Sequence, residues 1–234
     1  MNLLNAIKTL QMKYYQGCAV VIGSDIAALS HMMRDKIKQD SLILYQVSHD
    51  DTAKQPRIKS GLADFIDVQV DTTSPDAVNA LFALLISKKH QPKLVIFSPE
   101  ANDSTPTLAI TPTQIESSWQ MTGYSAFLVA QAALTQMQKV KVGTFLFLGS
   151  ALATQPMTPW LASSAMQAGV RALAQSLARE FNPQGIHVAY IALAHDAESK
   201  HAAKSTDLAM AIANSCWHAH KQSKQTWAQE FGTF

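Results

Sequence analysis

Serine, histidine and aspartate side chains supply the groups in this chain that nucleophilic or acid–base chemistry would use. His195 and Asp196 are adjacent, and His201 follows in the same polar stretch. Either Ser150 or Ser163 would complete a serine–histidine–aspartate arrangement, in which the imidazole takes the serine proton. The Gly-x-Ser-x-Gly turn that exposes such a serine in α/β-hydrolases is missing from the sequence, so a hydrolase has little support.

Three further histidines have positions that do not favour a metal site. His218 and His220 lie two residues apart on a predicted helix, where they point in different directions and cannot share an ion. We expect both rings to be solvated at the surface. His187 heads a predicted strand, where we expect a structural ring with its hydrogen bonds satisfied. The sequence therefore predicts no metal ion.

The elements that must position these side chains alternate between strand and helix. Seven mostly apolar segments predict strands: Cys18–Ile22, Leu42–Val47, Phe65–Val70, Leu94–Phe97, Thr144–Leu148, His187–Leu193 and Thr226–Phe231. Helical segments lie between them: Ile26–Lys38, Pro75–Lys88, Pro112–Gln138, Pro159–Phe181 and Thr206–Lys221. Uninterrupted apolar strands are typical of a parallel sheet covered on both faces. The pattern predicts one α/β domain over residues 1–234, a Rossmann-like doubly wound parallel sheet of about seven strands.

The composition is that of a folded protein with little net charge. Hydrophobic residues make up 47% of the 234 residues, charged residues make up 15%, and the formal net charge is +2. A disordered polar chain is therefore excluded. No basic cluster favours nucleic acid or an anionic membrane, which leaves small polar ligands or protein partners. We expect Cys18 and Cys216 to be buried thiols in a reducing environment.

Four stretches stand apart from the predicted core. Residues 1–16 form an N-terminal extension that lacks the continuous apolar region of a secretion signal, so we expect a cytoplasmic protein. The apolar stretch Val142–Ala153 is too short to span a bilayer. His49–Ser60 and residues 194–205 have the composition of linkers. We interpret the second either as a loop over the ligand crevice or as a solvated connection.

From residue 122 onward, several motifs follow one another in a fixed order. They are a helix over Thr122–Met137, a strand ending in serine over Gly143–Ser150, a helix ending in Ser-Leu-Ala-Arg-Glu over Ala168–Glu180, and a proline/glycine turn into a strand over Asn182–Val188. In this order and composition the chain resembles the short-chain dehydrogenase/reductases, as a divergent member. The resemblance covers about residues 17–231 and implies NAD or NADP as cofactor.

The resemblance also implies four catalytic positions, of which one keeps its residue. In that family a tyrosine exchanges a proton with the substrate, a lysine lowers the pKa of the tyrosine, a serine binds the substrate oxygen, and an asparagine supports a proton-relay water. These positions fall at Ser163, Gln167, Ser150 and Thr122 respectively. A serine hydroxyl without an adjacent cation is too weak an acid to replace tyrosine.

The resemblance places the cofactor-binding positions at Gly23, Ser24, Asp71 and Ser98. The second and third glycines of the family's phosphate loop are replaced by Ala27 and Leu29. Glycine at these places allows the backbone to approach a pyrophosphate closely. We therefore expect Leu29 to obstruct that approach.

Acidic residues further reduce the fit to a dinucleotide. Asp25 sits beside the N-terminus of the predicted first helix, where it either opposes a phosphate or simply caps the helix. Glu100 replaces the glycine of the family's Asn-Ala-Gly. Asp50 and Asp51 follow the second strand, so any dinucleotide bound there would carry a free ribose hydroxyl rather than a phosphate.

The family's subunit contacts suggest a homodimer or homotetramer. The helices around Thr122–Met137 and Ser163–Arg179 pack against a second subunit in that family. A face of small residues would allow close helix approach, namely Ala162, Ala165, Ala168, Gly169 and Ala172. The same face would also pack well on the domain's own sheet.

Two functions follow from these observations. The first is a catalytically impaired member of the family whose crevice or surface binds a small-molecule ligand or a protein partner. The alternative is an NAD(P)-dependent oxidoreductase acting on a carbonyl or hydroxyl with Ser150, Ser163 and Gln167 as an unusual catalytic set.

Overall fold

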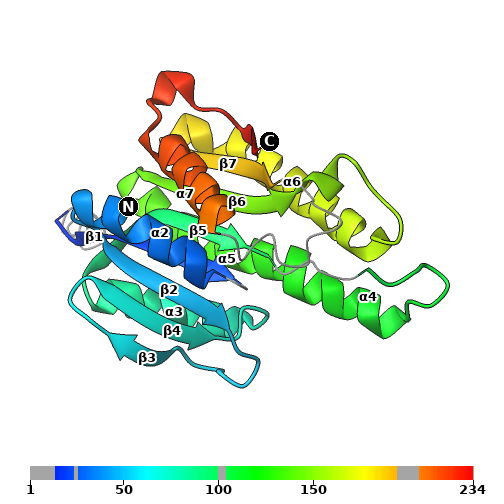
Figure 1. Ribbon diagram of the computed structural model, residues 1–234. Helices are drawn as coiled ribbons and strands as arrows, with labels where there is room; N and C mark the ends of the chain where they lie inside the picture. Colours follow the sequence, from blue (N-terminus) through cyan, green and yellow to red (C-terminus); the bar gives the residue numbers. More distant parts are fainter. Residues whose placement is uncertain (1–13, 24–25, 100–103, 194–205, 234) are drawn as a thin grey trace.

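The computed structural model describes residues 14–23, 26–99, 104–193 and 206–233 (Figure 1). Eight strands form one sheet in the order β3-β4-β2-β1-β5-β6-β7-β8, and every neighbouring pair is parallel except β3 and β4. The strands are β1 Gln16–Gly23, β2 Ile43–His49, β3 Arg57–Gly61, β4 Phe65–Val70, β5 His90–Ser98, β6 Gly143–Ser150, β7 Ile186–Leu193 and β8 Glu230–Thr233. The predicted Rossmann-like sheet is confirmed.

Helices cover both faces of the sheet, as Figure 1 shows. The helices α2 Ala27–Gln39 and α7 Thr206–Lys221 lie on one face, and α3 Pro75–Ser87, α5 Ser125–Val140 and α6 Leu161–Phe181 lie on the other. Along β1, Val20 belongs to the core on one side and Val21 to the core on the other. Because the inner strands are buried on both faces, their sequences read as continuous apolar runs.

Strand β3 begins within His49–Ser60, the stretch that its composition predicts to be a linker, and ends one residue after it. It pairs antiparallel with β4 at the edge of the sheet, and its register shifts between Ile58 and Ser60. All five of its residues are exposed. A charged, bulged edge strand carries no apolar signal, which explains why the prediction of about seven strands missed it.

The predicted helix Pro112–Gln138 contains a π-helical turn. Helix α4 spans Pro112–Trp119, the π turn η1 spans Gln120–Tyr124, and α5 continues from there. A capping box fixes the start, since the Thr111 and Gln114 side chains each accept a hydrogen bond from the other's backbone N–H. Helix α4 projects away from the rest of the fold (Figure 1).

Two elements begin later than the sequence predicts. Helix α6 begins at Leu161 rather than Pro159, because a turn precedes it in which the Trp160 N–H donates to the Met157 carbonyl. Strand β8 begins at Glu230 rather than Thr226, because a short 3₁₀ turn, η5 Lys224–Thr226, comes first.

The small-residue face of α6 divides between the core and the surface. Ala162 is 1% exposed and packs within the chain, which agrees with the alternative that this face packs on the domain's own sheet. Ala165, Ala168, Gly169 and Ala172 are exposed. Helix periodicity explains the difference, since Ala162 lies on the buried stripe with Val170 and Ala174.

Two histidines at the amino end of the sheet have structural roles. His187 is fully buried as predicted, with its ring nitrogens 3.1 Å from the Ala219 carbonyl and 2.9 Å from the Ala228 carbonyl. His220 is largely buried and lies 2.9 Å from the Thr144 hydroxyl through Nδ1, so the prediction of a solvated ring is wrong for it. The neighbouring His218 is exposed.

The burial of His220 predicts a pH dependence of folding stability. Burial, followed by the charge of Lys221, lowers the pKa of His220 from 6.5 to about 4. The native state therefore binds fewer protons than the unfolded chain between these values, and stability is lost as pH falls from 6.5 toward 4. We expect a loss of at most about 3 kcal/mol in the free energy of unfolding, measured by urea titration at several pH values.

A matched pair of variants isolates this contribution. His220→Gln should flatten the pH dependence of the unfolding free energy, whereas His218→Gln on the exposed side of the same helix should leave it as in the wild type. Parallel behaviour of the two variants would contradict the assignment to His220.

Candidate functional site

The carboxyl ends of β1 and β5 meet where the strand order reverses. Open α/β sheets bind their ligands in the crevice at such a point. Gly23 ends β1 directly opposite Ser98, the last residue of β5. Gly23 has φ +141°, and a Cβ there would overlap the Ser98 carbonyl, so the position requires glycine. Two of the predicted cofactor positions therefore lie side by side.

Gln167 connects the predicted catalytic positions. Its side chain is 3% exposed, and its Oε1 accepts a hydrogen bond of 3.1 Å from the Ser150 backbone N–H. The Tyr190 hydroxyl lies 3.1 Å from the Ser150 carbonyl and 3.5 Å from the same Oε1, so it donates mainly to the carbonyl. The amide of Gln167 thus links α6 to the end of β6, and Tyr190 links β7 to the same serine.

The other predicted catalytic residues surround this contact. Ser150 ends β6, and its Oγ accepts a 3.2 Å hydrogen bond from the Leu152 N–H. Ser163 lies one turn before Gln167 on α6 and is 2% exposed. Thr122 is 1% exposed in η1, which packs against α6. The structure brings Ser150 and Gln167 into contact and buries the side chains of Ser163 and Thr122 nearby.

The π turn alters the hydrogen-bonding groups around Thr122. Such turns displace carbonyls from their usual helical partners, frequently at functional sites. Here the Ser125 hydroxyl lies 2.7 Å from the Met121 carbonyl and 3.4 Å from the Thr122 carbonyl. The Ser125 side chain therefore donates to backbone carbonyls beside Thr122. Thr122 is the position that the resemblance associates with a relay water.

Tyr190 is a site residue that sequence reasoning missed. Its ring is fully buried on β7, and it fills the space that a Cβ on Gly149 would occupy. Burial raises the pKa of Tyr190 above its ordinary value, so the hydroxyl remains a hydrogen-bond donor. Gly149 within an apolar strand is the signal that could have indicated a close neighbour.

An ion pair beside Tyr190 fixes the last strand against α6. The Arg171 guanidinium binds the Glu230 carboxylate through Nε at 2.9 Å and through a second nitrogen at 2.8 Å. Gln175 donates to the same carboxylate at 3.0 Å. A bidentate pair of this kind holds both side chains in one geometry, and it anchors β8 on the side of Gln167.

Carboxylates at the other end of the crevice are already engaged. Asp71 is 2% exposed and forms a 2.6 Å ion pair with Lys54. Asp50 accepts hydrogen bonds from Thr52 and lies 3.6 Å from Arg57. Lys54 and Arg57, which lie between β2 and β4, therefore pair with these two carboxylates.

The first turn of α2 differs from the prediction in where Leu29 lies. The helix begins after Ile26, which makes no side-chain capping bond. Leu29 is 6% exposed and packs in the core beneath α2, so the expectation that it obstructs the crevice is wrong. Leu29 lies on the same buried face of the helix as Met33 and Ile37, and this face packs against the sheet.

Several predictions concern residues outside the described part of the chain. They are the N-terminal extension before residue 14, the roles of Ser24, Asp25 and Glu100, and the loop at 194–205 with His195, Asp196 and His201. Within the described residues, no group of three or more histidine, cysteine, aspartate or glutamate residues could hold a metal ion. None of the described helices has the length and apolar character to cross a membrane.

Comparison with known sequences identifies the family. A family model described as short chain dehydrogenase matches residues 15–207. The chain belongs to the short-chain dehydrogenase family. A search of curated proteins finds no match to this dehydrogenase-family chain.

Solved structures share the fold of this dehydrogenase-family chain at low sequence identity. A short-chain dehydrogenase from Rhodopseudomonas palustris has a TM-score of 0.76 at 20% identity, covering 93% of this chain and 98% of that one. ElxO with NADP bound has a TM-score of 0.76 at 13% identity, covering 92% and 96%. A mutant short-chain dehydrogenase/reductase from Serratia marcescens has a TM-score of 0.75 at 13% identity, covering 94% and 96%.

The described residues of this family member do not fit a nicotinamide dinucleotide in the family's manner. At the catalytic end, Gln167 supplies a neutral amide whose oxygen is bonded to the Ser150 N–H. At the opposite end, Asp71 is held by Lys54. Between these two ends the Ser98 carbonyl lies against Gly23, and residues 24 and 25, which follow Gly23, lie outside the described part of the chain.

The buried hydrogen bond of Gln167 predicts a stability effect. Gln167→Met removes the acceptor and leaves the Ser150 N–H without it, so we expect the free energy of unfolding to fall by about 1–3 kcal/mol. Gln39→Met, at an exposed position of α2, serves as the control and should change it by less than about 0.5 kcal/mol. Urea titrations of both variants measure the difference, and equal values would contradict a structural role for Gln167.

Proposed function

We propose that this chain is a single-domain, catalytically impaired member of the short-chain dehydrogenase family that binds a small-molecule ligand or a protein partner. One observation carries the proposal. The position that would hold an ammonium group in a reducing enzyme holds the Gln167 amide, whose Oε1 accepts from the Ser150 N–H. A neutral acceptor at this place has no charge with which to lower the pKa of a proton donor.

The burial of the neighbouring positions supports the same proposal. Ser163 is 2% exposed and Thr122 is 1% exposed. A catalytic acid must come within hydrogen-bond reach of the substrate oxygen. The hydroxyl of Ser150, which is partly exposed, remains the group best placed to bind a ligand in the crevice.

The alternative is an NAD(P)-dependent oxidoreductase with an unusual catalytic set. Family membership and the NADP-bound neighbour ElxO favour cofactor binding. The N-terminus of α2, where Ile26 makes no side-chain capping bond, favours an anion there. This alternative requires a proton donor other than a tyrosine beside a lysine, and Ser163 and Gln167 are weak candidates.

We also infer that the protein self-associates through α5 and α6. Ala165, Ala168, Gly169 and Ala172 form an exposed stripe on α6 on which another helix could pack closely. Phe127 on α5 is 44% exposed. A two-fold arrangement would bury both features, and the predicted assembly is a homodimer or homotetramer.

Cofactor titration tests the proposed function. Under the proposal, NADH or NADPH added to about 1 mM causes no energy transfer from tryptophan to the reduced nicotinamide, because the site lacks the groups that hold it. Fluorescence titration of the wild-type protein measures the transfer. A dissociation constant in the micromolar range for either cofactor would overturn the proposal and support the alternative.

Restoring the two missing residues provides the second test. Should the wild type bind cofactor, the double variant Ser163→Tyr/Gln167→Lys should gain carbonyl-reducing activity, since it restores a phenol four residues before an ammonium group. Gln167→Lys alone is the control, because it supplies the cation without the proton donor. Reductase activity in the wild type at the level of the double variant would contradict the impairment.

A further inference from the structure

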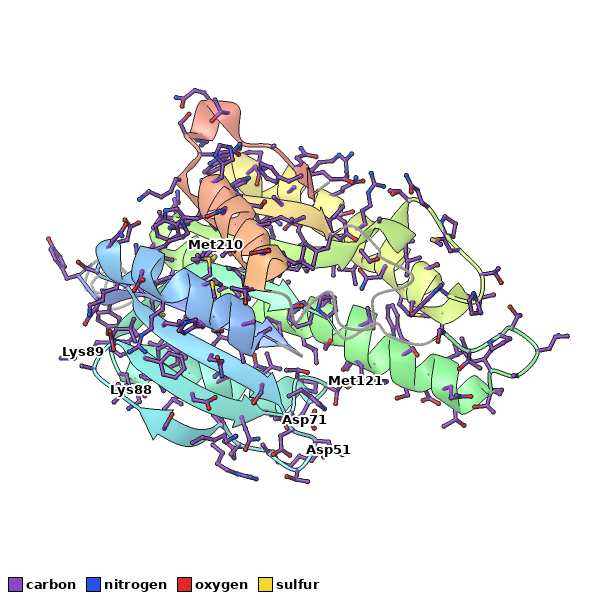
Figure 2. The ribbon with its side chains drawn as sticks, in the orientation of Figure 1. Asp51, Asp71, Lys88, Lys89, Met121 and Met210 are labelled. Atoms are coloured by element: carbon purple, nitrogen blue, oxygen red, sulfur yellow. The ribbon has the colours of Figure 1, made fainter. Side chains whose placement is uncertain are left out.

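The turn that follows β2 lies against the carboxyl end of β4. The Asp71 N–H donates to the Ala53 carbonyl at 3.0 Å, and Ala53 is 2% exposed. Figure 2 shows Asp51 and Asp71 together at this end of the sheet, with Lys88 and Lys89 at the opposite end. Ligands of open α/β sheets bind at the carboxyl ends of the strands. The turn after β2 therefore lies at the end of the sheet where a ligand would bind.

The Asp71 carboxylate is fully engaged within the protein. Its Oδ2 lies 2.6 Å from Lys54 Nζ, and its Oδ1 accepts from the Thr73 N–H at 2.9 Å and the Thr73 hydroxyl at 2.6 Å. The carboxylate is 3% exposed, whereas the Lys54 side chain is 70% exposed. Burial by itself would raise the pKa of Asp71, but the bonds from Lys54 and Thr73 outweigh it and hold the pKa below its usual value.

The second carboxylate of this end has a similar arrangement. Asp50 Oδ1 accepts from the Thr52 N–H at 2.9 Å and the Thr52 hydroxyl at 2.6 Å, and Oδ2 lies 3.6 Å from the Arg57 guanidinium. Thr72 is bonded to His49, whose Nδ1 lies 2.9 Å from the Thr72 hydroxyl. Asp71 and Thr72, which follow β4, are thus bonded to Lys54 after β2 and to His49 at the end of β2.

Nucleosides are read at this end of such sheets by carboxylates that accept from their hydroxyl and amino groups. We propose that Lys54 determines specificity by holding Asp71 in an internal ion pair, which closes this end of the crevice to adenine nucleotides. The inference rests on the proposed function in one respect, that the crevice serves a ligand other than a nicotinamide dinucleotide.

A phosphate-binding role for Lys54 is the competing explanation, and it predicts the opposite result. An ammonium that bound a ribose phosphate would raise affinity for phosphorylated nucleosides, whereas an ammonium that closes the site lowers affinity for all adenine nucleotides. The 2.6 Å contact with a buried carboxylate favours closure, since it pairs the Lys54 ammonium within the protein.

Substitution of Lys54 separates the two roles. The probes are adenosine 5′-monophosphate and adenosine 2′-monophosphate, followed by ligand-observed NMR with the full-length protein. Lys54→Met should bind both about ten- to a hundredfold more tightly than the wild type, the range for a hydrogen bond to a freed charged group. Lys54→Arg keeps the ion pair and should behave as the wild type. Lys59→Met, at an exposed position of β3, is the control and should also behave as the wild type.

The result decides the inference independently of the proposed function. Loss of adenosine 2′-monophosphate binding in Lys54→Met would overturn it and identify a phosphate site. Equal affinity in the wild type, Lys54→Met and Lys59→Met would overturn it as well, while the absence of NADH and NADPH binding to the wild type would still support the proposed function. Lys54→Met leaves the buried Asp71 carboxylate with its two bonds from Thr73 but without its counter-ion, so we expect a lower unfolding temperature, and a thermal unfolding curve checks that the variant is folded under the binding conditions.

Discussion

A single buried acceptor, the Oε1 of Gln167, constrains the crevice of this protein. The oxygen receives the Ser150 N–H, and the Tyr190 hydroxyl donates to the carbonyl of the same serine. A buried N–H that loses its partner carries a full desolvation cost, so the end of β6 depends on this amide. An ammonium group at residue 167 could not accept this hydrogen bond, because it has only N–H donors to offer to the Ser150 N–H. The amide of Gln167 is therefore part of how the end of β6 is held.

At the carboxyl ends of β2 and β4, ion pairs hold the polar groups in a comparable way. Lys54 and Arg57 come from the residues that connect β2 to β4, and they pair with Asp71 and Asp50. The buried pair at Asp71 would be costly to break, because one partner would be left as an uncompensated charge. The polar groups at both places thus bond within the protein, and between them Gly23 allows the close approach of the Ser98 carbonyl.

Much of the fold could be predicted from the sequence because its signals are local. Apolar runs such as Cys18–Ile22 and Leu94–Phe97 mark strands buried on both faces, and the cap at Thr111-Pro112 marks a helix start. Strand β3 could not be predicted, since its stability comes from pairing with β4 and its residues carry no apolar pattern. The burial of His220 likewise depends on Thr144, a residue 76 positions away in the chain.

For the site, the sequence by itself determined which residue types are present: a serine at 150, an amide at 167, and hydroxyls at 163 and 122. It also determined the family, because the order of motifs is written along the chain and is matched over residues 15–207. Only the tertiary structure decided where their polar atoms point. Tyr190 meets Ser150 across two paired strands, Leu29 turns into the core, and Lys54 reaches Asp71. Hydrogen bonds and ion pairs depend on distances of a few ångströms between residues far apart in sequence, and these distances are set by packing.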